Sequence, residues 1–162
     1  MVARIDRLGP GEGDRWRRIR LKALREAPYA FGTTYEEASR WDASRWEAQV
    51  AEFAIFIAVL DARDVGVARG AAHHRGDVRE LVSMWVDPKA RRAGIATLLI
   101  ESVAGWAIAD GAGILVLDVV ERNAAAISLY LHAGFARFEG EAMGENAAGE
   151  LRFVRSLAMT RQ

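Results

Sequence analysis

The segment Glu80–Gly111 places the tightest constraint on the fold, because it joins a strand, a tight turn and a helix without a linker. Its part Leu81–Val86 is an apolar run of strand length, and Ile95–Ala109 repeats apolar residues at helical spacing. A short basic stretch with small residues, Arg91–Ala96, lies between them. The first N–H groups of a helix have no internal partner, and the helix dipole adds partial positive charge there. The sequence therefore predicts a phosphate-binding turn at the start of this helix.

The composition of the whole chain narrows the class of protein. Its 162 residues are expected to form one domain, residues 1–162, with a full hydrophobic core. The formal net charge is zero, so nothing favours nucleic acid or an anionic membrane as a partner. The absence of cysteine excludes disulfides, thiolate zinc sites and a cysteine nucleophile. The sequence shows no apolar signal-peptide core and no apolar run of membrane-spanning length, so we expect a cytoplasmic protein.

Apolar periodicity and turn residues predict an α+β fold, in which helices pack on one mixed sheet. The expected strands are Val2–Leu8, Phe53–Leu60, Val65–His73, Leu81–Val86, Ile114–Val120, Phe135–Phe138 and Glu150–Met159. The expected helices are Arg15–Glu26 with Asp14 as its cap, Ala43–Phe53, Ile95–Ala109 and Ala124–Ala133. The order strand, helix, strand around Ile95–Ala109 favours parallel pairing of the two strands through a right-handed crossover.

Three surface features have two interpretations each. The first helix carries six basic residues, which form either a surface for RNA or lipid or a solvated face: Arg15, Arg17, Arg18, Arg20, Lys22 and Arg25. The zero net charge favours the solvated face. The aromatic segment Tyr29–Tyr35 lines a pocket or caps the core. The acidic loop Glu139–Glu150 attracts a cationic amine or is simply solvated, and the second is favoured.

Two adjacent histidines, His73 and His74, raise the question of a metal site. On a strand they are expected to point to opposite faces, where they cannot share a metal ion, and no third ligand is in sight. We therefore predict that the protein has no metal site.

Two motifs in order give the chain a family resemblance. The turn reads Arg91-x-x-Gly94-x-Ala96, and about 30 residues later a second block reads Asn123-x-x-Ala126-Ile127-x-Leu129-Tyr130, followed by Gly134-Phe135. With the order of strands and helices, these motifs resemble the GNAT superfamily, the acetyl-coenzyme-A-dependent N-acetyltransferases. The resemblance spans nearly the whole chain. Ala96 is the less usual choice at its position, and Arg92 is bulkier than the glycine often found there.

The resemblance implies a mostly antiparallel seven-stranded sheet with four helices, in which the parallel strands Leu81–Val86 and Ile114–Val120 splay apart. The pantetheine arm of acetyl-coenzyme A would pair with the opened strand edge. Main-chain contacts are then expected from Met84, Trp85 and Val86. The pyrophosphate would be held by Arg91, Arg92, Ala93, Gly94, Ile95, Ala96 and Thr97. Asn123 would contact the pantetheine arm, serve as a plain helix cap, or do both.

The resemblance also implies roles in proton transfer. Tyr130 matches the general acid that protonates the departing thiolate, and its alternative is a core tyrosine. Glu80 matches a base acting through water, and its alternative is a solvated carboxylate; Glu121 is a weaker candidate. Phe31 and Tyr35 are expected to contact the substrate. The acceptor is a small-molecule or peptide amine, and a homodimer is a possible assembly in such a family.

We therefore expect acetyl transfer from acetyl-coenzyme A to a primary amine by direct attack on the thioester. The alternative is a non-catalytic module that binds coenzyme A on the same fold, against which Tyr130 weighs. The sequence contains no Gly-x-x-x-x-Gly-Lys-(Ser/Thr), no Gly-x-Gly-x-x-Gly and no Gly-x-Ser-x-Gly. These absences argue against a nucleoside-triphosphate enzyme, a dinucleotide site and a serine hydrolase.

Overall fold

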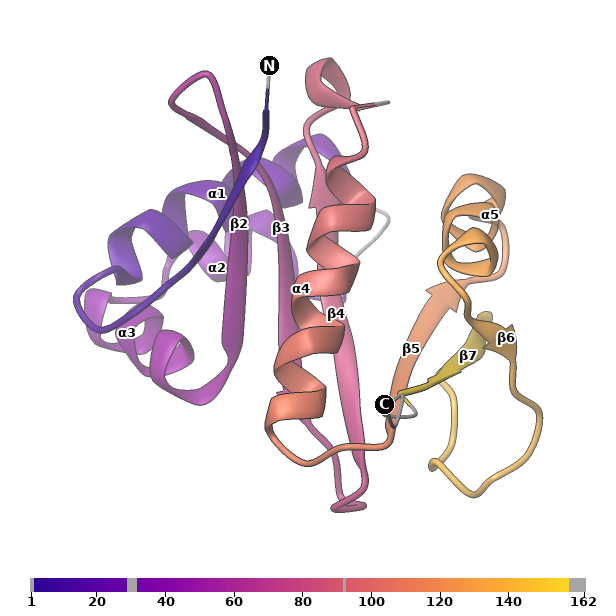
Figure 1. Ribbon diagram of the computed structural model, residues 1–162. Helices are drawn as coiled ribbons and strands as arrows, with labels where there is room; N and C mark the ends of the chain where they lie inside the picture. Colours follow the sequence, from indigo (N-terminus) through magenta and orange to yellow (C-terminus); the bar gives the residue numbers. More distant parts are fainter. Residues whose placement is uncertain (1, 29–31, 92, 158–162) are drawn as a thin grey trace.

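A seven-stranded mixed sheet forms the centre of the computed structural model, which describes residues 2–28, 32–91 and 93–157 (Figure 1). Its strands lie in the order β1-β2-β3-β4-β5-β7-β6. They comprise β1 (Arg4–Arg7), β2 (Ala54–Leu60), β3 (Arg63–Ala72), β4 (Val78–Val86), β5 (Ile114–Val120), β6 (Ala136–Arg137) and β7 (Glu150–Ser156). The pair β4–β5 is parallel, and the other pairs are antiparallel. The predicted α+β fold with a mostly antiparallel sheet is confirmed.

The four predicted helices are present, and within the described ranges two further short ones have given bounds. They are α1 (Gly13–Glu26), α2 (Tyr35–Ser39), α3 (Ala43–Glu52), the 3₁₀ helix η2 (Pro88–Ala90), α4 (Ile95–Ala109) and α5 (Ala124–His132). Helices α2 and η2 are too short to show a period in the sequence. The predicted cap Asp14 was wrong, since α1 begins at Gly13 with Glu12 in the capping position. Across the described ranges, no helix combines the length and the apolar character that crossing a membrane requires.

Two apolar layers cover the two faces of the sheet. Helices α4 and α5 pack on one face, with Leu99 and Val103 of α4 fully buried there. Helices α1, α2 and α3 pack on the other face around Trp16 and Trp46. Figure 1 shows α4 lying along β3 and β4, while α5 lies beside β5 at the other end of the sheet. On this face, α4 therefore covers the part of the sheet before the β4–β5 pair, and α5 covers the part after it (Figure 1).

The histidine pair lies outside the sheet ladder, because β3 ends at Ala72. The rings of His73 and His74 stack with their centroids 4.0 Å apart. The prediction that they point to opposite faces of a strand was therefore wrong. Among the residues that the structure describes, no three His, Asp or Glu side chains gather as a metal site would require.

The parallel pair separates after a short stretch of pairing. Strand β4 pairs with β5 only from Val78 to Glu80. Further along, β4 contains a bulge against β3, where the register shifts between Val67 and Arg69. Ser83, inside the bulge, has φ +58, a conformation that is uncommon for a residue with a side chain. The remainder of β4 therefore runs away from β5 with the edge that faces β5 lacking a strand partner.

Candidate active site

The separation of β4 from β5 coincides with a cavity of about 770 Å³. Its walls come from the free edge of β4, the first turn of α4, the facing side of β5, and helix α5. Side chains from α1 and β3 close it on the side of the α1–α3 layer. Most of the residues predicted for the site line this cavity.

The first turn of α4 leaves its N–H groups accessible. Gly94 precedes the helix in the left-handed conformation with φ +73, and no side chain caps the helix there. A Cβ on Gly94 would meet no atom within 4 Å, so the backbone is open on that side. Gly94, Ala96 and Thr97 all line the cavity. This turn fits an anionic group, because unpaired N–H groups and the helix dipole both favour negative charge.

Of the two arginines in the turn before α4, Arg91 is described by the structure. Arg91 turns back, with its Nε 3.1 Å from the carbonyl oxygen of Val86 and its Nη2 3.5 Å from Glu26. Half of its side chain remains exposed at the cavity, so its charge stays near the turn. The predicted contact Arg92 lies outside the described residues. Ala93 is exposed.

Met84, Trp85 and Val86 present their backbone, since their side chains are used in packing. Trp85 is buried in the α1–α3 layer, and its Nε1 donates to Glu26 at 2.7 Å. Met84 and Val86 pack in the α4 layer. Ile95 is similarly buried in the core. For these four residues a contact with a ligand in the cavity would have to come mainly from the main chain.

Tyr130 lies on α5 with 7% of its surface exposed, and its ring meets Phe135 edge to face at 5.8 Å. It lines the cavity, and none of the described residues hydrogen-bonds its hydroxyl. Burial raises the pKa of Tyr130 to about 12. The hydroxyl therefore keeps its proton throughout the physiological range and can act as a donor into the cavity.

Asn123 precedes α5, and its Oδ1 accepts from the N–H of Ala126 at 3.1 Å. It also lines the cavity. Asn123 therefore caps α5 in this structure, as one of its two interpretations predicted. Because it also lines the cavity, it can contact a ligand as well.

Glu80 is placed where a base would be useful, with 38% of its side chain exposed at the cavity. Its Oε1 lies 3.7 Å from Nε2 of His73. Nδ1 of His73 accepts from the N–H of Arg75, so Nε2 carries the proton and faces the carbonyl oxygen of Met143 at 3.1 Å. The weaker candidate Glu121 is exposed and does not line this cavity in the described part of the chain.

Neither of the two residues predicted to contact the substrate, Phe31 and Tyr35, is found in the described lining of the cavity. Phe31 lies outside the described residues. Tyr35 begins α2, where its hydroxyl accepts from Arg25, whose guanidinium lies 4.6 Å from the ring centroid. It packs against the α1–α3 layer and is absent from the described lining of the cavity, whereas Gly32 and Thr33 of the same segment line it.

Sequence reasoning missed two arginines in the cavity wall, Arg20 on α1 and Arg69 on β3. Burial lowers the pKa of Arg20 to about 9 and that of Arg69 to about 10. The solvated-face interpretation was wrong for Arg20, which is only 5% exposed. A signal was available, because Arg20 follows Trp16 by four residues and so shares the buried face of α1.

Sequence reasoning also missed a carboxylate in the cavity lining, Asp118 on β5. Asp118 interrupts the apolar run of β5, and both of its oxygens accept from Arg152 on β7 at 2.8 and 2.9 Å. Arg152 is buried, and its Nη1 donates to the carbonyl oxygen of Gly144. Glu150 lies nearby, and burial together with the charge of Asp118 raises its pKa. A charged residue inside an apolar strand was the signal for this carboxylate.

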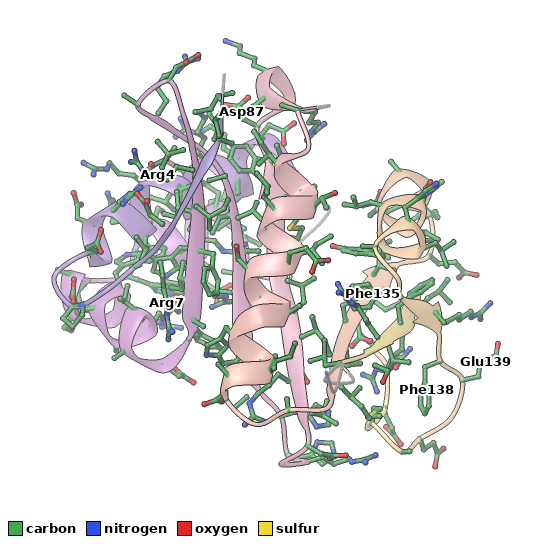
Figure 2. All side chains as sticks on the ribbon, in the orientation of Figure 1. Arg4, Arg7, Asp87, Phe135, Phe138 and Glu139 are labelled. Carbon is green, nitrogen blue, oxygen red and sulfur yellow. The ribbon has the colours of Figure 1, made fainter. Side chains whose placement is uncertain are left out.

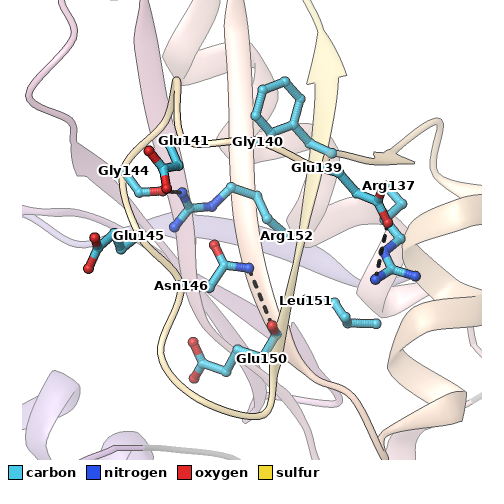
Figure 3. Close-up of a pocket in the computed structure, with 11 residues that line it drawn as sticks. Arg137, Glu139, Gly140, Glu141, Gly144, Glu145, Asn146, Glu150, Leu151 and Arg152 are labelled. Atoms are coloured by element: carbon cyan, nitrogen blue, oxygen red, sulfur yellow. Dashed lines mark hydrogen bonds and ion pairs between the residues drawn. The ribbon is translucent and has the colours of Figure 1, made fainter.

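A second hollow of about 400 Å³ lies in the loop between β6 and β7 (Figure 3). Phe138 and Glu139 mark this loop at the edge of the molecule in Figure 2. Asn146 donates to the carbonyl oxygen of Glu150 at 3.3 Å, and Arg137 pairs with Glu139 at 3.4 Å. The hollow has no helix N-terminus in its described lining. The cavity beside β4 is therefore the better candidate for an active site.

Comparison with known proteins agrees with this geometry. The sequence model of the acetyltransferase (GNAT) family matches residues 16–135. Human N-acetylaspartate synthetase is 35% identical over 80 residues, which are 49% of this chain; the chain thus spans about a quarter (26%) of that relative.

Two solved structures show the same fold along the whole chain. An acetyltransferase of the GNAT family from Streptococcus pneumoniae superposes with a TM-score of 0.78 at 18% identity, covering 97% of this chain and 100% of that one. The yncA protein of Salmonella typhimurium, solved with its cofactor acetyl-CoA, superposes with a TM-score of 0.72 at 16% identity, covering 100% and 98%. The family match and the shared fold together confirm the resemblance stated from the motifs.

Proposed function

The chain belongs to the acetyltransferase (GNAT) family, and we propose that it transfers an acetyl group from acetyl-coenzyme A to the primary amine of a small molecule or peptide. The observation that carries this proposal is the cavity at the free edge of β4, bounded by the open first turn of α4. A related fold has been solved with acetyl-CoA, which supports the same donor here.

The residues at the cavity fit the donor in two respects. The uncapped first turn of α4 suits the pyrophosphate, because the space beside Gly94 admits a ligand close to the backbone. The unpaired edge of β4 from Met84 to Val86 suits the amide groups of the pantetheine arm, since an extended ligand can pair there like an added strand. Main-chain N–H groups of this edge would also stabilise the oxyanion formed at the thioester carbonyl.

The reaction needs two proton transfers. The neutral amine attacks the thioester carbonyl carbon, a C–N bond forms, and the C–S bond breaks. We assign Glu80, acting through water, to remove the proton of the amine, and Tyr130 to donate a proton to the departing thiolate. The products are an N-acetylated amine and coenzyme A with a free thiol. Tyr130 suits its role because its raised pKa of about 12 keeps the hydroxyl protonated before the thiolate appears.

Acetyl-coenzyme A should raise the melting temperature of the protein and release free thiol when an acceptor amine is present. A ligand at about 100 times its Kd adds about 2.7 kcal/mol of stability. For a chain of this length, that stabilisation corresponds to a shift of roughly 5–10 °C. Differential scanning fluorimetry measures the shift, and a thiol-release assay with a panel of amines measures the transfer.

The two measurements distinguish the alternatives. No shift at millimolar acetyl-coenzyme A would reject the donor. A shift with no thiol release for any amine would instead favour a non-catalytic module that binds coenzyme A. Palmitoyl-coenzyme A serves as a control for acyl-chain length, because it carries the same pyrophosphate and pantetheine arm as acetyl-coenzyme A but a much longer acyl chain.

A further inference from the structure

The two arginines of the cavity wall bring positive charge to the side of the cavity away from the α4 turn. Arg20 comes from α1 and Arg69 from β3, and they lie close enough that each charge acts on the other. Burial lowers the pKa of both guanidinium groups, yet both values stay well above neutral. The cavity wall therefore carries two positive charges at physiological pH.

Arg69 is held rigidly while most of its donors stay available. Its guanidinium stacks over Phe53 at 4.2 Å and lies 5.4 Å from the ring centroid of Trp16. Its Nε donates to Oγ of Ser83 at 3.0 Å, and the bulge in β4 provides that hydroxyl. Within the described ranges its two terminal nitrogens make no hydrogen bond and no ion pair. Glu52 attracts Arg69 only at longer range.

The acidic side chains of the cavity come from other strands, Glu80 from β4 and Asp118 from β5. Asp118 is already paired with Arg152, whereas Glu80 is partly exposed at the cavity. Arg69 pairs with Val82 across the β3–β4 ladder, and Glu80 is two residues from Val82 along β4. Such diagonal neighbours on one face of a sheet lie roughly 7–8 Å apart. A cationic and an anionic side chain therefore face the same space without pairing to each other.

We propose that the acceptor is an amino acid or another small amine with a carboxylate close to its amino group, and that Arg69, with Arg20 beside it, binds this carboxylate. This inference rests on the proposed function, because it names the acceptor of the same cavity. A carboxylate matches the planar fork of an arginine and neutralises the buried charge of Arg69. Once it is bound there, the amino group lies on the side of Glu80, the assigned base.

The first test compares acceptors that differ only in the carboxylate. Melting temperatures of the wild-type protein are measured with saturating coenzyme A, with each of the twenty amino acids and with three amines that lack the carboxylate. The matched pairs are leucine with isoamylamine, phenylalanine with phenethylamine, and lysine with cadaverine. We expect at least one amino acid to raise the melting temperature, and no matched amine to do so.

The second test removes the charge of Arg69. Arg69→Gln should raise the KM of the best amino acid by roughly tenfold to a hundredfold, since hydrogen bonds to charged groups are among the stronger ones. The KM of acetyl-coenzyme A should stay unchanged. Arg69→Lys keeps the charge but loses the planar fork of the guanidinium. Its KM for the amino acid should lie between those of the wild type and Arg69→Gln. The matched control is Arg45→Gln. The guanidinium of Arg45 lies 3.9 Å from the ring centroid of Trp41, and Arg45 is not among the described residues that line the cavity.

The outcomes separate this inference from the proposed function. If coenzyme A and acetyl-coenzyme A both leave the melting temperature unchanged, the proposed function fails. If they stabilise the protein but no amino acid adds to the effect, or the matched amines add as much, the carboxylate site is overturned. An equal rise in KM for both substrates in Arg69→Gln would indicate a structural role for Arg69 and would also overturn it.

Discussion

The cavity has two walls that are built in different ways. The helix wall consists of the free edge of β4 from Met84 to Val86 and the α4 turn from Gly94 to Thr97. It offers mainly backbone groups, and the side chains of Trp85 and Ile95 are buried behind it. One continuous segment of about 14 residues makes this wall, so its geometry is decided locally by a strand, a turn and a helix cap.

The charged wall consists of Arg20, Arg69, Glu80, Asp118 and Arg152. These side chains come from α1, β3, β4, β5 and β7, and only the tertiary fold brings them together. The difference teaches that a backbone site suits a ligand part shared by a whole family, whereas a wall of side chains can change one residue at a time. We therefore expect the donor to depend on the helix wall and the acceptor to depend on the charged wall.

Tyr130 belongs to neither wall, and its substitution should have the largest effect. Tyr130→Phe is expected to lower turnover by about 100-fold or more, because general acid catalysis contributes about 10²–10⁴. The KM of both substrates should change little, since the ring and its contact with Phe135 remain. Steady-state kinetics with acetyl-coenzyme A and the best acceptor measure this split.

The control for Tyr130 is Tyr35→Phe, which also removes a phenol but lies outside the described cavity lining. Its turnover should match that of the wild type.

The pH profile adds a second check. Because the pKa of Tyr130 is raised to about 12 from an ordinary value of about 10, the proton is retained up to the higher value. A decline in wild-type turnover near pH 10 that disappears in Tyr130→Phe would contradict the raised pKa of Tyr130, while still identifying its hydroxyl as the acid.

The sequence predicted the helix wall well because each of its parts has a local signature. The helix Ile95–Ala109 and the strand Ile114–Val120 were predicted with the bounds that the structure has. Gly94 in a left-handed turn and the order of strand and helix are readable from neighbouring residues. The bulge at Ser83 was not predictable, because it depends on the register against β3 and serine has no preference for positive φ.

The charged wall was mostly missed for the opposite reason. Arg20 looked like one of six surface cations. Its spacing from Trp16 places it on the buried face of α1, but only tertiary packing brings it to the cavity. Asp118 has its partner Arg152 at a separation of 34 residues, which no local pattern encodes. The turn after β3 brought His73 and His74 together, because the strand ended one residue earlier than predicted. Long-range contacts therefore limited the prediction of the charged wall.

The second prediction tests how far the charged wall also supports the fold. Arg152→Met leaves Asp118 without its ion-pair partner. Breaking a buried pair costs about 3–5 kcal/mol, but Asp118 is 31% exposed, so we expect a loss of roughly 2 kcal/mol in the free energy of unfolding. Urea denaturation measures it. Adding Asp118→Asn should recover part of the loss, because the unpaired charge is then gone.

The matched control for Arg152 is Arg4→Met, which removes an ion pair of the same length, 2.8 Å, between Arg4 and Asp6. Arg4 is 68% exposed, and solvent screens an exposed ion pair of this kind. The loss for Arg4→Met should therefore be much smaller. Equal losses in the two variants would mean that the charged wall contributes nothing special to stability, and its residues would then be free to serve the acceptor alone.

The third prediction uses the two ends of α4 to isolate the helix wall. Gly94 precedes the helix with φ +73, and Gly111 follows it with φ +89. A Cβ at either position would meet no atom within 4 Å, so alanine adds only backbone strain, about 1–2 kcal/mol in each case. Gly94→Ala and Gly111→Ala should therefore lose similar stability in the absence of ligand.

Only one of these variants should weaken the binding of acetyl-coenzyme A. In Gly94→Ala the new methyl group points into the space that a ligand needs, so the Kd should rise by about tenfold, or about 1.4 kcal/mol. Gly111→Ala carries the same strain at the far end of the helix and should keep the wild-type Kd. Isothermal titration calorimetry gives both values. Equal losses of affinity would show that strain in α4, and not access to its first turn, controls the donor site, and the distinction between the two walls would then fail.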